Sequence, residues 1–297
     1  MVAFQRFKGC RQVFWEAPDY DLGETLNSGQ AFRWMPLEGG WEGILGNQWV
    51  WLGQKGNQIC LQTCSRTPSL LATIRDYLQL DLDYEEVLAS FPKDRVMRQA
   101  IRQCRGLRIL KQPPWECLAS FILSSTKQII QIRDVVETLS LRYGAEIKAP
   151  SGALGRRAFP EVAVIASCSE KELRACRMGF RAPNLLGAAR AIVEGRLDLS
   201  ALHVLECEEA REKLLDLRGV GRKIADCVLL FAYGKQRAFP VDVWVARALR
   251  ELYFPARKEV SLKELQAFSD SHFGHWGGYA QQYLFHYMRT VRGRGRD

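Results

Sequence analysis

The chain has 297 residues, of which 47% are hydrophobic and 25% are charged, and its 42 Lys and Arg against 33 Asp and Glu give a net charge of +9. This composition excludes a collagen-like, low-complexity or wholly disordered chain and predicts a basic globular protein of about two domains. A basic excess is typical of proteins with a phosphate-rich partner, but it does not identify that partner.

The N-terminal region is rich in Trp, Gly and Gln. Short apolar runs at Trp41–Gly43, Trp49–Leu52 and Ile59–Gln62 are separated by Gly46-Asn47 and Gly56-Asn57. Both dipeptides favour tight turns between paired strands. The pattern predicts an antiparallel sheet in this part of the chain.

From about Pro68 onward, apolar residues recur at the i, i+3, i+4 spacing of helices that bury one face. The predicted helices cover Leu70–Leu80, Asp94–Cys104, Trp115–Leu123, Ile129–Tyr143, Glu170–Met178, Asn184–Glu194, Glu208–Leu217, Ile224–Tyr233, Val243–Leu252, Leu262–Phe273 and Tyr279–Met288. The fold class is therefore α+β, with an antiparallel β lobe over 1–66 followed by a mostly α-helical body over 67–297. We expect the Arg-Gly run at 289–296 to be a solvated tail.

The segment Gly219-Val220-Gly221 lies between two predicted helices. It predicts a helix–hairpin–helix around residues 208–233. The two glycines permit positive φ angles and leave backbone N–H groups accessible, and the second helix adds the positive end of its dipole, so the hairpin suits a phosphate oxygen. For this tripeptide alone, a plain helix corner with a glycine cap is the alternative.

Lys223 and Asp242 carry the candidate chemistry. Lys223 falls in the first turn of the second hairpin helix, where the helix dipole disfavours a cation and so favours the neutral amine that can attack an electrophilic carbon. Asp242, in the sequence Pro-Val-Asp, precedes another predicted helix and has the position of an N-cap. A solvated lysine and a simple capping aspartate are the alternatives for each residue alone.

Several motifs in chain order resemble those of the 8-oxoguanine DNA glycosylases of the helix–hairpin–helix, Gly/Pro-Asp superfamily. LNSGQAFRW at 26–34 resembles their LPSGQSFRW segment, and ECLASFILSS at 116–125 resembles their ECLFSFICSS helix. GFRA at 179–182 and AQQYLF at 280–285 match two further segments, and the hairpin lysine and Asp242 complete the set. Because these motifs run from residue 26 to residue 285, the resemblance covers nearly the whole chain.

The resemblance implies a base excision repair enzyme that removes 8-oxoguanine from duplex DNA and has abasic-site lyase activity; formamidopyrimidines are further candidate lesions. Lys223 corresponds to the lysine that attacks C1′ of the deoxyribose, releases the base and forms the Schiff base from which the strand is cleaved by β-elimination. Asp242 corresponds to the aspartate that stabilises positive charge developing on the sugar. An enzyme acting on a stacked base must first rotate the nucleotide into a pocket.

For base recognition, the resemblance assigns the backbone carbonyl of Gly29 to the N7–H group found only in the oxidised base. Gln281 corresponds to the residue that contacts the Watson–Crick edge, with Gln282 as a rival, while Phe285 and Cys227 correspond to the pair that encloses the base plane. On their helices alone, these side chains equally fit core or surface positions.

The chain departs from the eukaryotic members at four positions that contact DNA. Thr126 replaces Asn, Gln131 replaces Arg, Phe180 replaces Tyr and Trp244 replaces His, whereas Arg181 keeps the family arginine. Because fewer side chains can contact the unpaired cytosine, we expect a weaker preference for cytosine opposite the lesion.

The expected partner is double-stranded DNA containing oxidised guanine, bound by a monomer, with no membrane partner, no metal and no cofactor. No cysteine follows Cys227, whereas the endonuclease III branch carries a C-terminal iron–sulfur loop. Without an apolar span or signal peptide, we expect an intracellular protein, in the nucleoid or cytoplasm of a prokaryote or the nucleus of a eukaryote. The alternatives are a non-catalytic helix–hairpin–helix DNA-binding protein and a glycosylase for alkylated bases.

Overall fold

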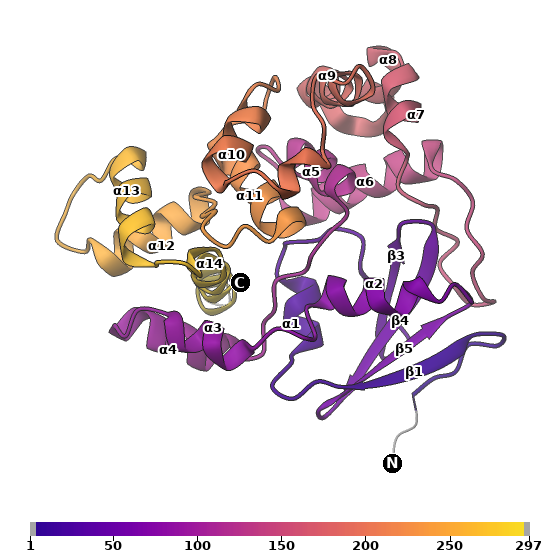
Figure 1. Ribbon diagram of the computed structural model, residues 1–297, viewed down its shortest axis with the longest axis horizontal. Coiled ribbons are helices and arrows are strands. Elements are labelled where there is room, and N and C mark those ends of the chain that lie inside the picture. Colours follow the sequence, from indigo (N-terminus) through magenta and orange to yellow (C-terminus); the bar gives the residue numbers. More distant parts are fainter. Residues whose placement is uncertain (1–3, 294–297) are drawn as a thin grey trace.

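The computed structural model describes residues 4–293 and contains an antiparallel sheet followed by a helical body (Figure 1). The sheet has the strand order β1-β5-β4-β3-β2. Its strands are β1 (Arg11–Glu16), β2 (Met35–Leu37), β3 (Gly40–Leu45), β4 (Gln48–Lys55) and β5 (Gln58–Thr63). The predicted α+β class and the antiparallel N-terminal sheet are confirmed.

Two tight hairpins fix the register of the sheet. Gly46-Asn47 connects β3 to β4, and Gly56-Asn57 connects β4 to β5, as the turn dipeptides predicted. The sequence did not predict β1 or β2. β2 has only three residues, and β1 joins the edge of the sheet by pairing with β5, a partner distant in the sequence.

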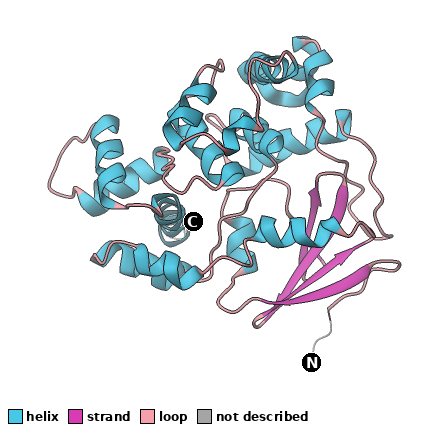
Figure 2. Cartoon of the chain, viewed as in Figure 1, coloured by secondary structure: helices cyan, strands magenta, loops and turns pink. Residues whose placement is uncertain are grey.

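The helical body accounts for most of the remaining chain (Figure 2). The α-helices are α1 (Leu22–Asn27), α2 (Ser69–Leu78), α3 (Tyr84–Ser90), α4 (Arg95–Cys104), α5 (Pro114–Leu123), α6 (Ile129–Tyr143), α7 (Val162–Ser167), α8 (Glu170–Leu173), α9 (Ala182–Val193), α10 (Cys207–Leu215), α11 (Arg222–Tyr233), α12 (Val243–Tyr253), α13 (Leu262–His272) and α14 (Gly277–Gly293). Within residues 4–293, every helix is too short or too polar to span a membrane.

The structure differs from the predicted helices in three ways. The short helices α1, α3 and α7 were not predicted. The helix predicted over Glu170–Met178 is α-helical only to Leu173; it continues as a π-helical turn over Arg174–Met178, in which Arg177 has a φ of +62°. The predicted solvated tail is wrong for residues 289–293, since α14 continues to Gly293; residues 294–297 lie outside the described part of the chain.

The core of the body surrounds α5, α11 and α14. Phe121 of α5 stacks on Phe231 of α11, with ring centroids 5.5 Å apart and an interplanar angle of 15°. In Figure 1, α14 is seen nearly end-on in the middle of the body, close to α4 and α12. This packing fixes the helix ends that line the site.

Buried polar contacts join the sheet lobe to the body. The Gln30 side chain, just after α1, accepts a hydrogen bond from the Leu110 amide at 2.7 Å and donates one to the Arg108 carbonyl at 2.7 Å. Arg156 forms two bonds with Glu137 of α6, at 3.0 and 2.7 Å, and donates to the Arg33 carbonyl at 2.8 Å. These contacts hold the turn after α1 in a fixed place beside the helices.

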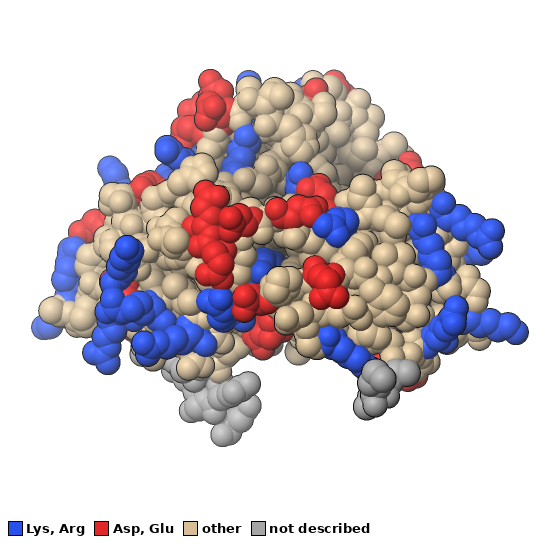
Figure 3. Space-filling view, turned by 60° about the horizontal axis from the view of Figure 1, so that its bottom comes forward, with Lys and Arg blue, Asp and Glu red and all other residues tan. Residues whose placement is uncertain are grey.

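The positive charge is not spread evenly over the surface. On the face shown in Figure 3, Asp and Glu form a band across the middle, whereas Lys and Arg gather on both flanks. The net charge of +9 therefore does not locate a phosphate-binding surface without the positions of individual side chains.

Candidate active site

A cavity of about 1020 Å³ lies where the sheet lobe meets the helical body. Its walls come from the turn after α1, the end of α5 and the start of α6, the N-termini of α11 and α12, and α14. The lining residues are Asn27, Gly29, Phe32, Phe121, 124–130, Ile132, Arg133, Lys223, Ile224, 241–244, Phe285 and Arg289. The cavity thus brings together side chains that are far apart in the sequence.

The hairpin between α10 and α11 places the start of α11 at this cavity. Gly219 has a φ of +81°, and a Cβ there would lie 2.2 Å from Nδ2 of Asn184, so only glycine fits. Val220 is buried and anchors the turn. Gly221 caps α11 without a side-chain bond, which leaves first-turn N–H groups able to bind an anion.

A buried ion pair holds the two hairpin helices together. Nε of Arg211 on α10 lies 2.6 Å from Oδ1 of Asp226 on α11. Burial raises the pKa of Asp226 to about 6, while the Arg211 charge acts in the opposite direction. This pair fixes the orientation of α11 and, with it, the direction of the Lys223 side chain.

Lys223 extends from the first turn of α11 into the cavity. Its Nζ lies 3.5 Å from Oγ of Ser124 and 5.2 Å from the centre of the Phe121 ring. Among residues 4–293, no carboxylate lies within ion-pair distance of this amine. The amine is therefore exposed to a ligand in the cavity and not held by a salt bridge.

Asp242 is the N-cap of α12, as the sequence predicted. Its Oδ1 accepts a hydrogen bond from the Val245 amide at 2.8 Å. Burial raises the pKa of Asp242 above its usual value, and the backbone bond and the charge of Lys223 partly offset that rise. The carboxylate is thus desolvated and electrostatically coupled to Lys223, an arrangement that can stabilise positive charge in the cavity.

Gly29 forms the opposite wall of the cavity, in the turn that follows α1. Its φ is +81°, and a Cβ there would lie 2.7 Å from Cδ1 of Ile129 and 3.4 Å from Cε1 of Phe285. Both the backbone conformation and the close neighbours require glycine at this position. The main chain at Gly29 can therefore approach a flat ligand that packs against Phe285.

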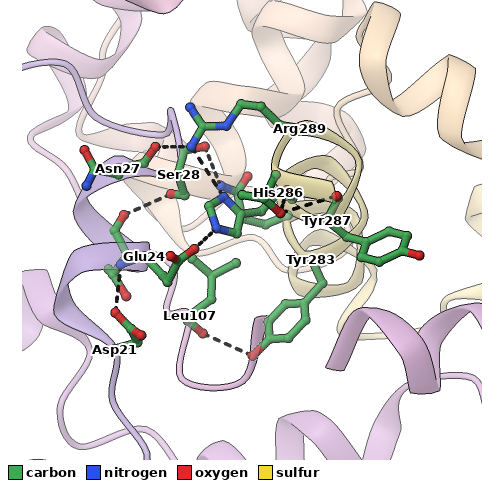
Figure 4. Close-up of polar contacts among 12 residues, drawn as sticks. Asp21, Glu24, Asn27, Ser28, Leu107, Tyr283, His286, Tyr287 and Arg289 are labelled. Atoms are coloured by element: carbon green, nitrogen blue, oxygen red, sulfur yellow. Dashed lines mark hydrogen bonds and ion pairs between the residues drawn. The ribbon is translucent and has the colours of Figure 1, made fainter. Parts of the chain in front are cut away.

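Three side chains on one face of α14 hold the Gly29 turn, and two of them, His286 and Arg289, are labelled in Figure 4. Gln282 donates to the Ser28 carbonyl at 3.3 Å, His286 pairs with Glu24 of α1, and Arg289 donates to the Asn27 carbonyl. Their spacing of four and then three residues places them on the same helix face. Gln282 therefore serves to position the turn, which separates its role from that of Gln281.

Gln281 and Cys227 are buried and do not line the cavity, so their predicted contacts with a base stay predictions. Oε1 of Gln281 is nevertheless a buried acceptor without a hydrogen-bond partner. Burial raises the pKa of Cys227 to about 12, with Lys223 partly opposing that rise, so the thiol is an apolar neighbour of the lysine rather than a second nucleophile. Among residues 4–293, no cluster of His, Cys, Asp and Glu could hold a metal ion.

Two family descriptions match most of the chain. Residues 12–118 match the family described as the N-terminal domain of 8-oxoguanine DNA glycosylase, and residues 119–269 match the HhH-GPD superfamily of base excision DNA repair proteins. The chain belongs to the HhH-GPD superfamily of DNA glycosylases.

Full-length relatives and solved structures place the chain in the 8-oxoguanine branch of that superfamily. The N-glycosylase/DNA lyase OGG1 of Arabidopsis thaliana is 30% identical over 277 residues, which cover 88% of this chain and 75% of the relative. The structure of MBOgg1 in complex with a low-affinity DNA ligand is 34% identical, with a TM-score of 0.89 and coverage of 95% and 96%. The Clostridium acetobutylicum 8-oxoguanine glycosylase/lyase, solved with duplex DNA containing cytosine opposite 8-oxoguanine, is 32% identical, with a TM-score of 0.87 and coverage of 94% and 98%.

In this glycosylase, Arg181 stabilises the loop between α5 and α6 through hydrogen bonds. The guanidinium of Arg181 is buried and donates to the Ser125 carbonyl, at 2.7 Å from Nε, and to Oγ1 of Thr126 at 2.5 Å. Thr126 itself has a φ of +57°, a strained conformation that these bonds stabilise. A direct contact between Arg181 and DNA stays a prediction.

The other residues predicted to contact DNA are exposed at the same side of the glycosylase. Phe180 is 58% exposed, and Gln131 is exposed at the start of α6, where its side chain accepts a bond from the Gln128 amide at 3.1 Å. Trp244 is partly exposed on the cavity wall. Their positions are compatible with the DNA contacts, which stay predictions.

The sequence analysis missed two cationic residues of this cavity, Arg133 and Arg289. Arg133 lies inside an amphipathic helix, and Arg289 was assigned to a solvated tail. The sequence alone carried no signal for either residue, because only the fold shows that Ile129 and Phe285, four residues before them, are the neighbours that a Cβ at Gly29 would meet.

Proposed function

We propose that this glycosylase acts as a monomer on double-stranded DNA, removes 8-oxoguanine, and cleaves the strand at the resulting abasic site. The observation that carries the proposal is the single cavity that contains Lys223, Asp242 and the Gly29 turn. All of its walls come from one chain, so a second subunit is not required.

The proposed reaction begins with an extruded nucleotide whose sugar lies between Lys223 and Asp242. Nζ of Lys223 forms a bond to C1′ as the C1′–N9 bond breaks, and the bonding electron pair leaves with the base. The carboxylate of Asp242 stabilises the positive charge that develops on the sugar during this exchange. The sugar–lysine adduct opens to a Schiff base, and loss of the C2′ proton then expels the 3′ phosphate.

The proposed base contacts use the opposite wall. The Gly29 carbonyl accepts the N7–H of 8-oxoguanine, a group that guanine lacks, and Phe285 packs on the base plane. The unpaired Oε1 of Gln281 supports a role in accepting an N–H from the Watson–Crick edge, because a buried acceptor without a donor is costly until a ligand supplies one. Cys227 lies on the far side of the base plane in this proposal.

A lesion panel tests the proposal against its alternatives. The glycosylase is expected to release 8-oxoguanine at least about 100-fold faster than guanine, because the unpaired Gly29 carbonyl penalises a base without the N7–H donor. Duplexes with formamidopyrimidine, 3-methyladenine or no lesion are assayed in parallel for base release and strand cleavage. Preferential release of 3-methyladenine would support an alkylated-base glycosylase, and binding without any release would leave a DNA-binding protein.

We expect a weak dependence on the base opposite the lesion. Thr126 and Gln131 stand where the eukaryotic relatives have the contacts to cytosine, and the remaining Arg181 is bonded within the protein. Since a bidentate arginine contributes about 1–3 kcal/mol of discrimination, its absence is expected to keep the rates for the four opposing bases within about 10-fold. Single-turnover base release from the four duplexes measures this.

The matched variant Gln131→Arg is expected to raise the preference for cytosine by about 5- to 100-fold. Gln131→Ala is the control, because it removes the bond to the Gln128 amide without adding a guanidinium. A steep cytosine preference in the unmodified chain would contradict the prediction.

A further inference from the structure

Arg133 and Arg289 are two cations on the cavity wall. Nε of each is buried and has no hydrogen-bond partner. Among residues 4–293, Arg133 forms no ion pair, because Glu137, one turn further along α6, is already bonded to Arg156 and Arg33. A buried N–H group without an acceptor is costly, so these two Nε groups point to a ligand that completes the site.

The two arginines occupy equivalent positions on the two helices that flank Gly29. Ile129 of α6 and Phe285 of α14 are the neighbours that a Cβ at Gly29 would meet. Arg133 and Arg289 follow them by four residues, which places each arginine one turn along the same helix face. The two side chains therefore reach the cavity beside the Gly29 turn from opposite helices.

The electrostatics of the pair indicate an anionic ligand. Burial lowers the pKa of Arg289, and the charge of Arg133 lowers it further, whereas Glu24 acts in the opposite direction. Burial likewise lowers the pKa of Arg133, with a further contribution from Arg156. A neutral carbonyl would leave the repulsion between the two guanidiniums in place, whereas a phosphate compensates both charges and offers several acceptor oxygens.

Arg289 makes one hydrogen bond to a backbone carbonyl, and this bond orients its guanidinium group. Its Nη2 donates to the Asn27 carbonyl at the end of α1 and lies 3.5 Å from Nδ1 of His286 (Figure 4). This leaves other N–H groups of Arg289 for a ligand, since a guanidinium has five donors. Arg133 contributes at least its Nε, which has no acceptor in the described part of the chain.

We propose that Arg133 and Arg289 together bind one backbone phosphate of the damaged strand, next to the extruded nucleotide. This subsite rests on the proposed function, because it requires a strand that enters the cavity. It holds the strand against the Gly29 turn while Lys223 and Asp242 act on the sugar from the other wall. The chemistry of the ligand is that of a phosphate, and the experiment distinguishes a strand phosphate from free phosphate.

The test measures binding of an 8-oxoguanine duplex in a Lys223→Gln background, so that turnover does not interfere. Arg133→Gln is the main variant because Arg133 forms no ion pair with the described residues, so its replacement breaks none that supports the fold. We expect each of Arg133→Gln and Arg289→Gln to weaken binding about 5-fold or more and to reduce the slope of log K against log salt by about 1. Arg102→Gln, which removes an exposed charge from α4, is the control and is expected to leave both unchanged.

Neutral methylphosphonate linkages, placed one at a time around the lesion, then identify the phosphate. One position is expected to weaken binding about 5-fold or more with both arginines present, and less than about 2-fold in the Arg133→Gln, Arg289→Gln double variant. Equal losses at every position in both proteins would overturn the proposal, because they would indicate a diffuse field. Stabilisation by inorganic phosphate without such coupling would assign the site to free phosphate and overturn it as well.

Failure of this subsite can be distinguished from failure of the proposed function. Base release by the chain with its native Lys223 tests the function and does not require the arginine pair. Intact base release without phosphate coupling would reject the subsite alone, whereas phosphate coupling without base release would reject the catalytic proposal alone.

Discussion

Lys223→Gln is expected to abolish the covalent adduct that borohydride traps on an 8-oxoguanine duplex and to lower base release about 1000-fold or more. The reason is chemical: glutamine keeps a polar side chain of similar reach but has no amine that can form and hold a Schiff base. Nζ of Lys223 is the nucleophile candidate in the cavity because it faces Ser124 and Phe121 and makes no ion pair. Gel separation of the trapped complex and single-turnover base release measure the two effects.

The control for this prediction is Lys263→Gln, which removes an exposed lysine of α13 outside the cavity. It is expected to trap and to release base like the unmodified chain. Lys223→Gln should keep the melting temperature and still bind duplex, since the bond from Lys223 to Ser124 is long, at 3.5 Å, and glutamine can replace it. If the Lys223→Gln protein still forms a trapped adduct, another amine is the nucleophile and the assignment of Lys223 is wrong.

The sequence predicted long elements well because their patterns are local. The helix over Ile129–Tyr143 was predicted with its observed bounds, since its apolar residues repeat over four turns. α1 was missed because Leu22–Asn27 is only six residues long and depends on its Asp21 cap and on packing against α14. The turn that α1 sets up, and with it the environment of Gly29, is therefore a tertiary feature.

The candidate site could be predicted only where residue type and motif coincide. Lys223 and Asp242 stand out because each occupies a helix start, which the sequence marks with Gly221 and Pro240. Arg133 could not be singled out, because an arginine on an amphipathic helix is usually solvated and only the engagement of Glu137 elsewhere leaves it unpaired. The role of a charged side chain thus depends on which partners the fold has already used.

Asp242→Asn is expected to lower base release about 100-fold or more without weakening the fold. Asparagine is as good an N-cap as aspartate, so the bond to the Val245 amide can persist while the negative charge is lost. Single-turnover base release and thermal melting at neutral pH separate the two roles. Asp242→Ala, which removes charge and cap together, is expected to lose a similar rate and also about 1 kcal/mol of stability.

The raised pKa of Asp242 fixes the sign of two further effects. Burial favours the protonated form of Asp242 in the folded chain. The carboxyl therefore contributes to stability at pH values below its pKa in the unfolded chain, and this contribution is lost as the pH rises through its pKa in the folded chain. Asp242→Asn should therefore melt no lower than the unmodified chain at pH 7.

The activity depends on pH in the opposite direction, because the carboxylate is the form of Asp242 that stabilises the sugar cation. Base release should therefore fall on acidification, at a pH above the range usual for aspartate. Asp242→Asn should lack that decline. If Asp242→Asn keeps full activity, Asp242 serves only as a helix cap and is not the electrostatic partner of Lys223 in the reaction.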